Sequence, residues 1–158
     1  GCFCIRMGIE AGSNKLIKSI RKYNGDWKSL VINVSKWGKE ADIIMNFYVI
    51  IGLPNETKDD REETINLIKE AMPDFVQIHY FKPYPGSSIY DNINNKEEFN
   101  EYLYHYNCSS EEFNDIKSRI HKIVYFNPIS ITKHLSLFSG FYIKNPKILL
   151  RLINFLFN

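Results

Sequence analysis

The chain has 158 residues, enough for one domain with a substantial hydrophobic core. Its hydrophobic content of 44% and charged content of 24% are ordinary for a globular protein, and a net charge of +2 is too small to indicate a nucleic acid or an anionic membrane. Three cysteines without a disulfide pattern and no secretory signal predict a cytoplasmic location. Because a strand-like segment follows Gly1 almost directly, we expect the parent domain to begin further upstream.

The first predicted strand is the apolar run "CIRMGIEAGS" at 4–13, which closes in a Gly-Ser pair. Ser13 is the predicted N-cap of a helix over "NKLIKSIRKY", which an Asn-Gly pair at 24–25 ends. A second helix is predicted from Trp27 to about Lys39. The order at this point is one strand followed by two helices.

The second predicted strand is "DIIMNFYVII" at 42–51, rich in aromatic and β-branched residues. After a Gly-Leu-Pro turn, Thr57 and Asp60 form a capping pair that predicts the start of a third helix. A third strand is predicted at 75–81, before the loop "KPYPGSS". This alternation of strands and helices predicts an α/β fold with a parallel sheet and helical crossovers.

The character of the chain changes near residue 91. Two helices are predicted over 95–106 and 109–126, the second capped by Ser109 with Glu112. The apolar segment 146–158 is shorter than the ~20 residues that cross a bilayer, so no transmembrane segment is expected. We therefore divide the chain into an α/β part, 1–91, and a helical C-terminal extension, 92–158.

Polar side chains are expected on one face of the predicted sheet. Because side chains alternate along a strand, Tyr48 shares a face with Ile50, and Gln77 shares a face with His79. Glu10 at the end of the first strand belongs to the same set if it faces that side. In parallel α/β folds, ligands bind at the carboxyl ends of the strands, so this face predicts a cavity rather than a dry core.

Three segments carry a resemblance to a known family: "GIEAGS" at 8–13, "FYVIIGLPNET" at 47–57 and "FKPYPGSSIYD" at 81–91. In order and spacing they resemble the second half of the core of radical S-adenosylmethionine (SAM) enzymes. They are most similar to the branch with GIESGS, FIIGLPGET and PYPGTPLY, which includes many cobalamin-binding members. The resemblance covers about 4–91.

The resemblance implies the C-terminal half of a partial (β/α)6 barrel, with the three strands here as the fourth to sixth. It implies SAM and a [4Fe–4S] cluster as cofactors, and cobalamin in the parent protein is a further candidate. In the family, one electron from the cluster cleaves SAM to a 5′-deoxyadenosyl radical, which abstracts hydrogen from a substrate. The implied partners are the missing N-terminal half and a small-molecule substrate; no nucleic acid is evident.

The resemblance also implies cofactor-binding residues. Glu10 would accept hydrogen bonds from the SAM ribose hydroxyls, although an acid here also favours a helix dipole. Ser13 could reach SAM, but its capping role is a sufficient explanation. Ile50, Ile51 and Gly52 would hold the adenine, the alternative being a plain buried strand with a turn glycine.

Four residues around these positions have simpler expected roles. His79 could line the cavity near adenine or substrate, although a lone strand histidine is more often structural. Asn55 replaces the family's usual glycine and tolerates positive φ. Glu56 is expected to serve the helix start rather than chemistry. Tyr84 is expected to shape the rim of the site.

The cysteines do not form a cluster-binding loop. Cys2 and Cys4 are expected to be buried strand residues, and Cys108 stands alone. Since no trio has C-x-x-x-C-x-x-C spacing, the chain contributes no cluster ligands, no catalytic residue is assigned, and we predict inactivity in isolation. The alternative is a non-catalytic α/β remnant or binding module that uses its helical tail for a partner.

Overall fold

The computed structural model describes residues 1–20, 22–84, 86, 107–126, 128–137, 139 and 147. The described elements are, in chain order, β1 (Cys4–Glu10), α1 (Asn14–Ser19), α2 (Trp27–Glu40), β2 (Ile44–Ile51), α3 (Lys58–Ala71), β3 (Phe75–Tyr80), α5 (Ser110–Tyr125) and α6 (Pro128–Leu137). The predicted helix over 95–106 and nearly all of the terminal apolar segment 146–158 lie outside the described residues.

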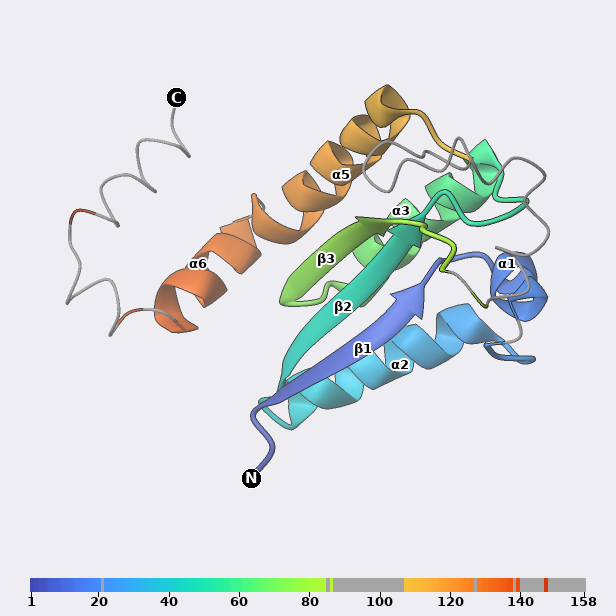
Figure 1. Ribbon diagram of the computed structural model, residues 1–158. Coiled ribbons are helices and arrows are strands. Elements are labelled where there is room, and N and C mark those ends of the chain that lie inside the picture. The colour runs from blue at the N-terminus through green and yellow to red at the C-terminus, as the bar shows by residue number, and fades with distance from the viewer. Residues whose placement is uncertain are drawn as a thin grey trace.

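The strands form a three-stranded sheet in the order β1-β2-β3, and both pairings are parallel (Figure 1). Met7 pairs with Phe47, and Phe47 pairs with Val76. The helices α1 and α2 connect β1 to β2, and α3 connects β2 to β3. The predicted α/β fold with a parallel sheet is therefore confirmed.

One face of the sheet packs on helices and forms the core. Phe47, Val49 and Ile51 of β2 have no exposed surface, because alternation points them toward the helix layer. α2 lies beside α3, and α3 lies beside α5 (Figure 1). The helices add further fully buried side chains to this core, which include Ile17, Val31, Ile68 and Ile120.

The helix ends follow the predicted capping chemistry, with one difference in length. Thr57 and Asp60 form a complete capping box at α3, as Ser109 and Glu112 do at α5. The first helix, predicted to continue to residue 23, ends at Ser19, where the Ile20 N–H bonds back to the Leu16 carbonyl. Because α1 ends at Ser19, the chain turns after it and brings Lys22 to Glu10 at the end of β1.

The helix α5 shares the core of the sheet, and its last residue protects a sheet edge. Four residues of α5 are buried: Phe113, Ile116, Ile120 and Val124. The Tyr125 hydroxyl lies 3.0 Å from both the amide nitrogen and the carbonyl oxygen of Val76. These contacts satisfy backbone groups on β3 that would otherwise attract another strand. The following helix, α6, has no counterpart among the predicted helices.

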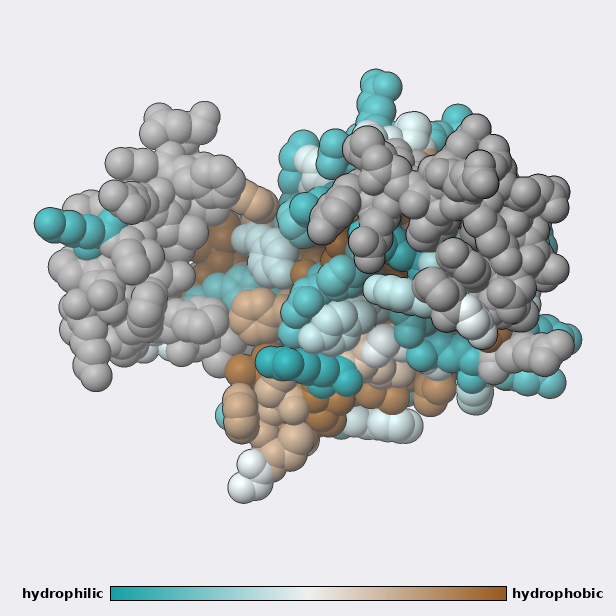
Figure 2. All heavy atoms as spheres, in the orientation of Figure 1, coloured by the Kyte–Doolittle hydropathy of each residue, from teal (hydrophilic) through white to brown (hydrophobic). Residues whose placement is uncertain are grey.

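The opposite face of the sheet is more open. Arg6, Gln77 and His79 are exposed there, while Tyr48 and Ile50 are half-buried. Figure 2 shows mixed hydrophilic and hydrophobic atoms in the middle of the molecule, where Figure 1 shows the strands, and apolar atoms near the N-terminus. The expectation that Cys2 and Cys4 are buried strand residues is wrong for Cys2, which is exposed and precedes β1, while Cys4 is half-buried.

Candidate functional site: a hollow at the carboxyl ends of the strands

A hollow of about 800 Å³ lies toward the carboxyl ends of the strands, and its lining residues come from both faces of β3. Its volume lies within the range of ~300–1,000 Å³ that is usual for small-molecule sites. Aromatic and aliphatic side chains form most of its lining, which also includes one acidic residue, one lysine and one histidine. The lining residues are Glu10, Tyr48, Ile50, Ile78, His79, Tyr80, Phe81, Lys82, Tyr84 and Phe113.

The floor of the hollow is set by the register of β2 and β3. Tyr48 pairs with Gln77, and Ile50 pairs with His79. The rings of Tyr48 and His79 are nearly parallel, with 6.2 Å between their centroids and 13° between their planes. The Gln77 Nε2 atom lies 3.4 Å from the Tyr48 hydroxyl. A flat, partly apolar floor of this kind suits a planar ring, with polar groups beside it.

Glu10 reaches this hollow from an unusual backbone turn. Its φ of 59° is in the left-handed region, and the pairing of β1 with β2 shifts register between Gly8 and Glu10. The carboxylate forms an ion pair with Lys22, whose Nζ lies 3.1 Å from Oε1. A negative charge therefore stands at the end of β1, beside the aromatic floor.

The six predicted cofactor-binding residues divide into two groups. Glu10, Ile50 and His79 line the hollow together. The Ile51 side chain is fully buried on the helix side of the sheet. Ser13 is 2% exposed, and its hydroxyl caps α1 by accepting from the Leu16 N–H at 3.3 Å. Gly52, with a φ of 89°, turns the chain away from β2.

Glu56, predicted to support the start of a helix, in the structure also bonds to Gly52 and Arg61. Its side chain has no exposed surface, and Oε2 accepts from the Gly52 N–H at 2.6 Å and from Arg61 Nε at 3.1 Å. Its other oxygen is buried without a hydrogen-bond partner among the described residues. Burial raises the pKa of the Glu56 carboxyl above its ordinary value. Glu56 thus ties the loop after β2 to α3.

Asn107 and Arg61 extend this network to the segment before α5. The Asn107 amide donates to the carbonyls of Leu53 at 3.0 Å and Glu56 at 2.7 Å. Arg61 donates in turn to the Asn107 carbonyl. Asn55 has a φ of 60°, as expected for a residue that replaces glycine in this turn. The loop that ends β2 is therefore held by the buried Glu56 on one side and by the half-buried Asn107 on the other.

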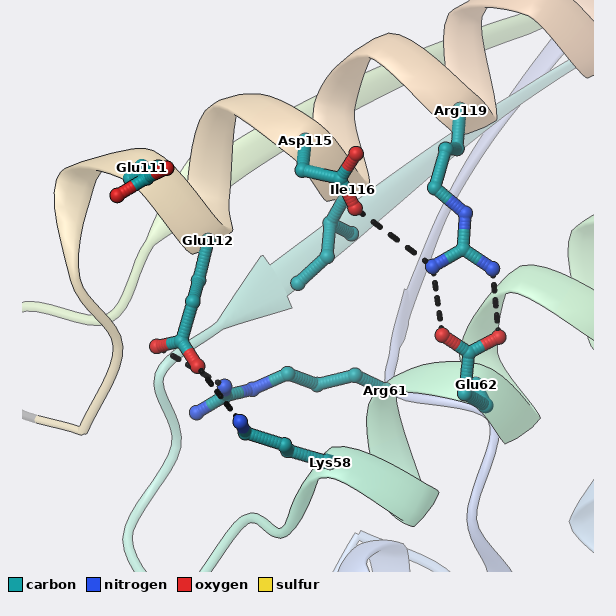
Figure 3. Close-up of a pocket in the computed structure, with 8 residues that line it drawn as sticks. All are labelled: Lys58, Arg61, Glu62, Glu111, Glu112, Asp115, Ile116 and Arg119. Carbon is teal, nitrogen blue, oxygen red and sulfur yellow. Dashed lines mark hydrogen bonds and ion pairs between the residues drawn. The ribbon is translucent and has the colours of Figure 1, made fainter.

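A second, charged groove lies between α3 and α5 (Figure 3). Arg119 forms two bonds of 2.6 Å with Glu62, which hold the pKa of the Glu62 carboxyl below its ordinary value. Arg61 extends from α3 toward Glu112, at 3.5 Å, and Lys58 lies 3.6 Å from the same carboxylate. Since these cations and carboxylates face one another, we interpret the groove as a clasp between two helices rather than a binding site.

Three residues in the hollow or beside Glu10 escape sequence reasoning. Phe113 stacks on Tyr80, with 3.6 Å between the ring centroids, but it comes from α5, far away in the sequence. Lys22 and Trp27 lie near Glu10 because the chain turns after α1. Only Trp27 gives a signal in the sequence, as a large aromatic residue at a predicted helix start.

Metal sites and membrane spans can be assessed for the described residues alone. In that part of the chain, no three His, Cys, Asp or Glu residues are arranged to hold a metal ion. None of the helices described is long and apolar enough to cross a bilayer. These residues therefore do not fit an iron–sulfur cluster, and we derive no step through one.

The fold and the hollow define the class of this protein: an α/β chain with a ligand-sized site at the carboxyl ends of parallel strands. No family model matches the sequence. Relatives are found among tRNA-2-methylthio-N(6)-dimethylallyladenosine synthases. The protein of Rickettsia typhi is 31% identical over 86 residues, covering 52% of this chain and 19% of the relative. That of a Clostridium botulinum strain is 36% identical over 76 residues, covering 46% and 16%.

An uncharacterized methyltransferase of Pyrococcus horikoshii is also similar, with 31% identity over 91 residues, or 58% of this chain and 19% of the relative. The chain thus spans less than a fifth of the length of these relatives. Both kinds of relative are named as enzymes, which supports an enzyme as the parent protein. The synthases are named for a product in tRNA. The expectation that no nucleic acid is involved therefore does not hold for these related proteins.

Proposed function

We propose that this chain is the SAM-binding half of a radical SAM enzyme. The observation that carries the proposal is that Glu10, Ile50 and His79, from segments far apart in the sequence, line one hollow. Two of these residues belong to the family-like segments, and His79 stands just before the third. The similarity to proteins named as a tRNA-2-methylthio-N(6)-dimethylallyladenosine synthase and as an uncharacterized methyltransferase supports the same proposal.

The residues of the hollow fit an adenosyl group. Glu10 accepts hydrogen bonds from the ribose hydroxyls, and Ile50 packs against the adenine on the floor that Tyr48 and His79 extend. Ser13 contributes by holding α1 in place, while Ile51 and Gly52 shape the strand end. In the complete enzyme, bound SAM would supply a 5′-deoxyadenosyl radical once one electron from a cluster held outside these residues had cleaved it with release of methionine, and the walls of the hollow would orient the adenosyl group. A partial barrel in the parent protein is part of the proposal, and cobalamin is a further candidate cofactor of that protein.

A titration of the full chain with SAM tests the proposal. We expect NMR signals of Glu10, Ile50 and His79 to shift, with an affinity of about 1 mM or weaker because much of the family's site is absent. Glu10→Gln should weaken binding, whereas the exposed Glu40→Gln should not. Shifts confined to other surfaces, or none, would contradict the proposal and favour a non-catalytic module.

Iron and sulfide reconstitution tests the expected inactivity of the isolated chain. Under anaerobic conditions we expect no site-bound [4Fe–4S] spectrum and no cleavage of SAM, because Cys2, Cys4 and Cys108 lack cluster spacing. Absorption and electron paramagnetic resonance spectra provide the measurement. A stoichiometric cluster with SAM turnover would show that this prediction is wrong.

The substrate trials for the complete enzyme should include tRNA beside small molecules, since relatives are named for a tRNA product.

A further inference from the structure

The turn at Glu10 is the most constrained backbone feature near the hollow. The Ala11 N–H donates to the Ile9 carbonyl at 2.7 Å, which closes a three-residue turn around Glu10. With a φ of 59°, the backbone of Glu10 lies in a region that residues other than glycine rarely adopt. Such a conformation persists only where the surrounding structure holds it, and it is frequent at functional sites.

Trp27 holds the backbone of this turn. Its indole N–H lies 3.2 Å from the Ile9 carbonyl oxygen and 3.0 Å from that of Ala11, the two residues that flank Glu10. The Trp27 side chain is buried, and Trp27 is the first residue of α2. The start of α2 is therefore locked to both sides of the turn.

Lys22 and Gly8 hold the Glu10 carboxylate. Lys22 Nζ lies 3.1 Å from Oε1 and 5.8 Å from the centroid of the Trp27 ring. A Cβ at Gly8 would lie 2.5 Å from the same carboxylate oxygen. The carboxylate therefore occupies the space that the Cβ of any other residue at position 8 would take. Among the described residues, no donor is found for the second oxygen, Oε2.

We propose that Lys22 and Trp27 are positioning residues that hold the Glu10 carboxylate ready to accept a vicinal diol at the hollow. Trp27 sets the backbone direction of Glu10, and Lys22 engages one carboxylate oxygen so that the other is presented. This inference rests on the proposed function, because the diol is the ribose of the adenosyl ligand. The two positioning residues lie outside the three family-like segments, and the turn between α1 and α2 brings them to Glu10.

A purely structural role makes a different prediction from a positioning role. If Trp27 and Lys22 only fasten α2 to β1, their replacement weakens all ligands of the hollow alike. If they position Glu10, their replacement removes the part of the affinity that depends on the hydroxyls. Adenosine and 2′,3′-dideoxyadenosine differ only in this diol and therefore separate the two roles.

The test measures both nucleosides on the full chain by NMR titration of the Ile50 and His79 signals. We expect the unaltered chain to prefer adenosine by roughly tenfold, because hydrogen bonds to a charged group are lost without the diol. Lys22→Met, Trp27→Phe and Gly8→Ala should each bring that ratio close to about one, while the affinity for dideoxyadenosine changes little. The matched control Lys18→Met, on the exposed side of α1, should keep the preference.

Each outcome decides a separate point. A preference that survives in both Lys22→Met and Gly8→Ala overturns the positioning role while the proposed SAM site stands. Binding of neither nucleoside to the unaltered chain contradicts the proposed function, and the position of Glu10 in a crystal structure of Lys22→Met then decides the inference. A carboxylate still above Gly8 overturns it, and a displaced carboxylate supports it. Lys22 is partly exposed, so its variant tests the inference even if Trp27→Phe does not fold.

Discussion

Replacement of Arg61 by methionine is expected to destabilise the protein by about 3–5 kcal/mol, the usual cost of removing one partner of a buried ion pair. The Arg61 side chain is 7% exposed and Glu56 has no exposed side-chain surface, so the remaining carboxylate cannot turn to water. The variant also loses the bond from Arg61 to the Asn107 carbonyl. Urea unfolding followed by circular dichroism measures the change in the free energy of unfolding.

The same variant should show a characteristic pH dependence. Burial raises the pKa of the folded-state Glu56 carboxyl, so the folded state binds a proton more tightly than the unfolded state does. The stability linked to this group is therefore fully present below the unfolded pKa of about 4.3 and is lost as the pH rises through the folded value. Because Arg61→Met removes the compensating cation, its deficit should be largest near neutral pH and smaller in acid.

Two controls separate the buried pair from ordinary surface charge. Arg119→Met removes an exposed pair with Glu62 in the neighbouring groove and should cost less than about 1 kcal/mol. Glu56→Gln combined with Arg61→Met should be more stable than the sum of the single changes predicts, since no unpaired charge remains. A deficit for Arg61→Met no larger than that of Arg119→Met would contradict the interpretation of Glu56.

Gly12→Ala is expected to destabilise the fold by about 3 kcal/mol, at the upper end for overpacking. An added Cβ would lie 2.4 Å from the Glu63 carbonyl oxygen and 2.5 Å from the Thr64 Cα, and backbone atoms of α3 cannot move aside easily. The Gly12 N–H also donates to the Thr64 hydroxyl at 2.8 Å, a bond that requires the close approach. Thermal unfolding measures the loss.

Gly25→Ala is the matched control for that substitution. Its added Cβ would meet the ring of Tyr23 at 2.7 Å, but this side chain is 41% exposed and can rotate away. We expect a change within about 0.5 kcal/mol, typical of a surface substitution. Equal losses for the two glycines would show that the contact of Gly12 with α3 does not limit stability.

Both predictions concern the framework around the hollow. The pair of Glu56 and Arg61 holds the loop that ends β2, and Gly12 holds the turn that follows β1 against α3. The ends of two adjacent strands, and the residues that they present, are thereby fixed relative to one another. A substitution that loosens the Glu56–Arg61 pair or the contact of Gly12 with α3 without unfolding the protein should therefore weaken ligand binding at the hollow.

The sequence by itself determined the local features of this protein. The apolar runs predicted three parallel strands, and the Thr57 and Ser109 capping boxes predicted the starts of α3 and α5, because these signals act between residues a few positions apart. Alternation along β2 and β3 placed Ile50 and His79 on the open face, where the structure has them beside one another.

Only the tertiary structure decided how distant side chains meet. Glu56 reads as a helix-start acid in the sequence, yet it is buried against Gly52 and Arg61, since the loop folds back on α3. The turn after α1 brings Lys22 and Trp27 to Glu10, and the packing of α5 brings Phe113 to Tyr80. Such contacts depend on where whole elements pack, and no local pattern encodes the direction in which a chain returns to its own sheet.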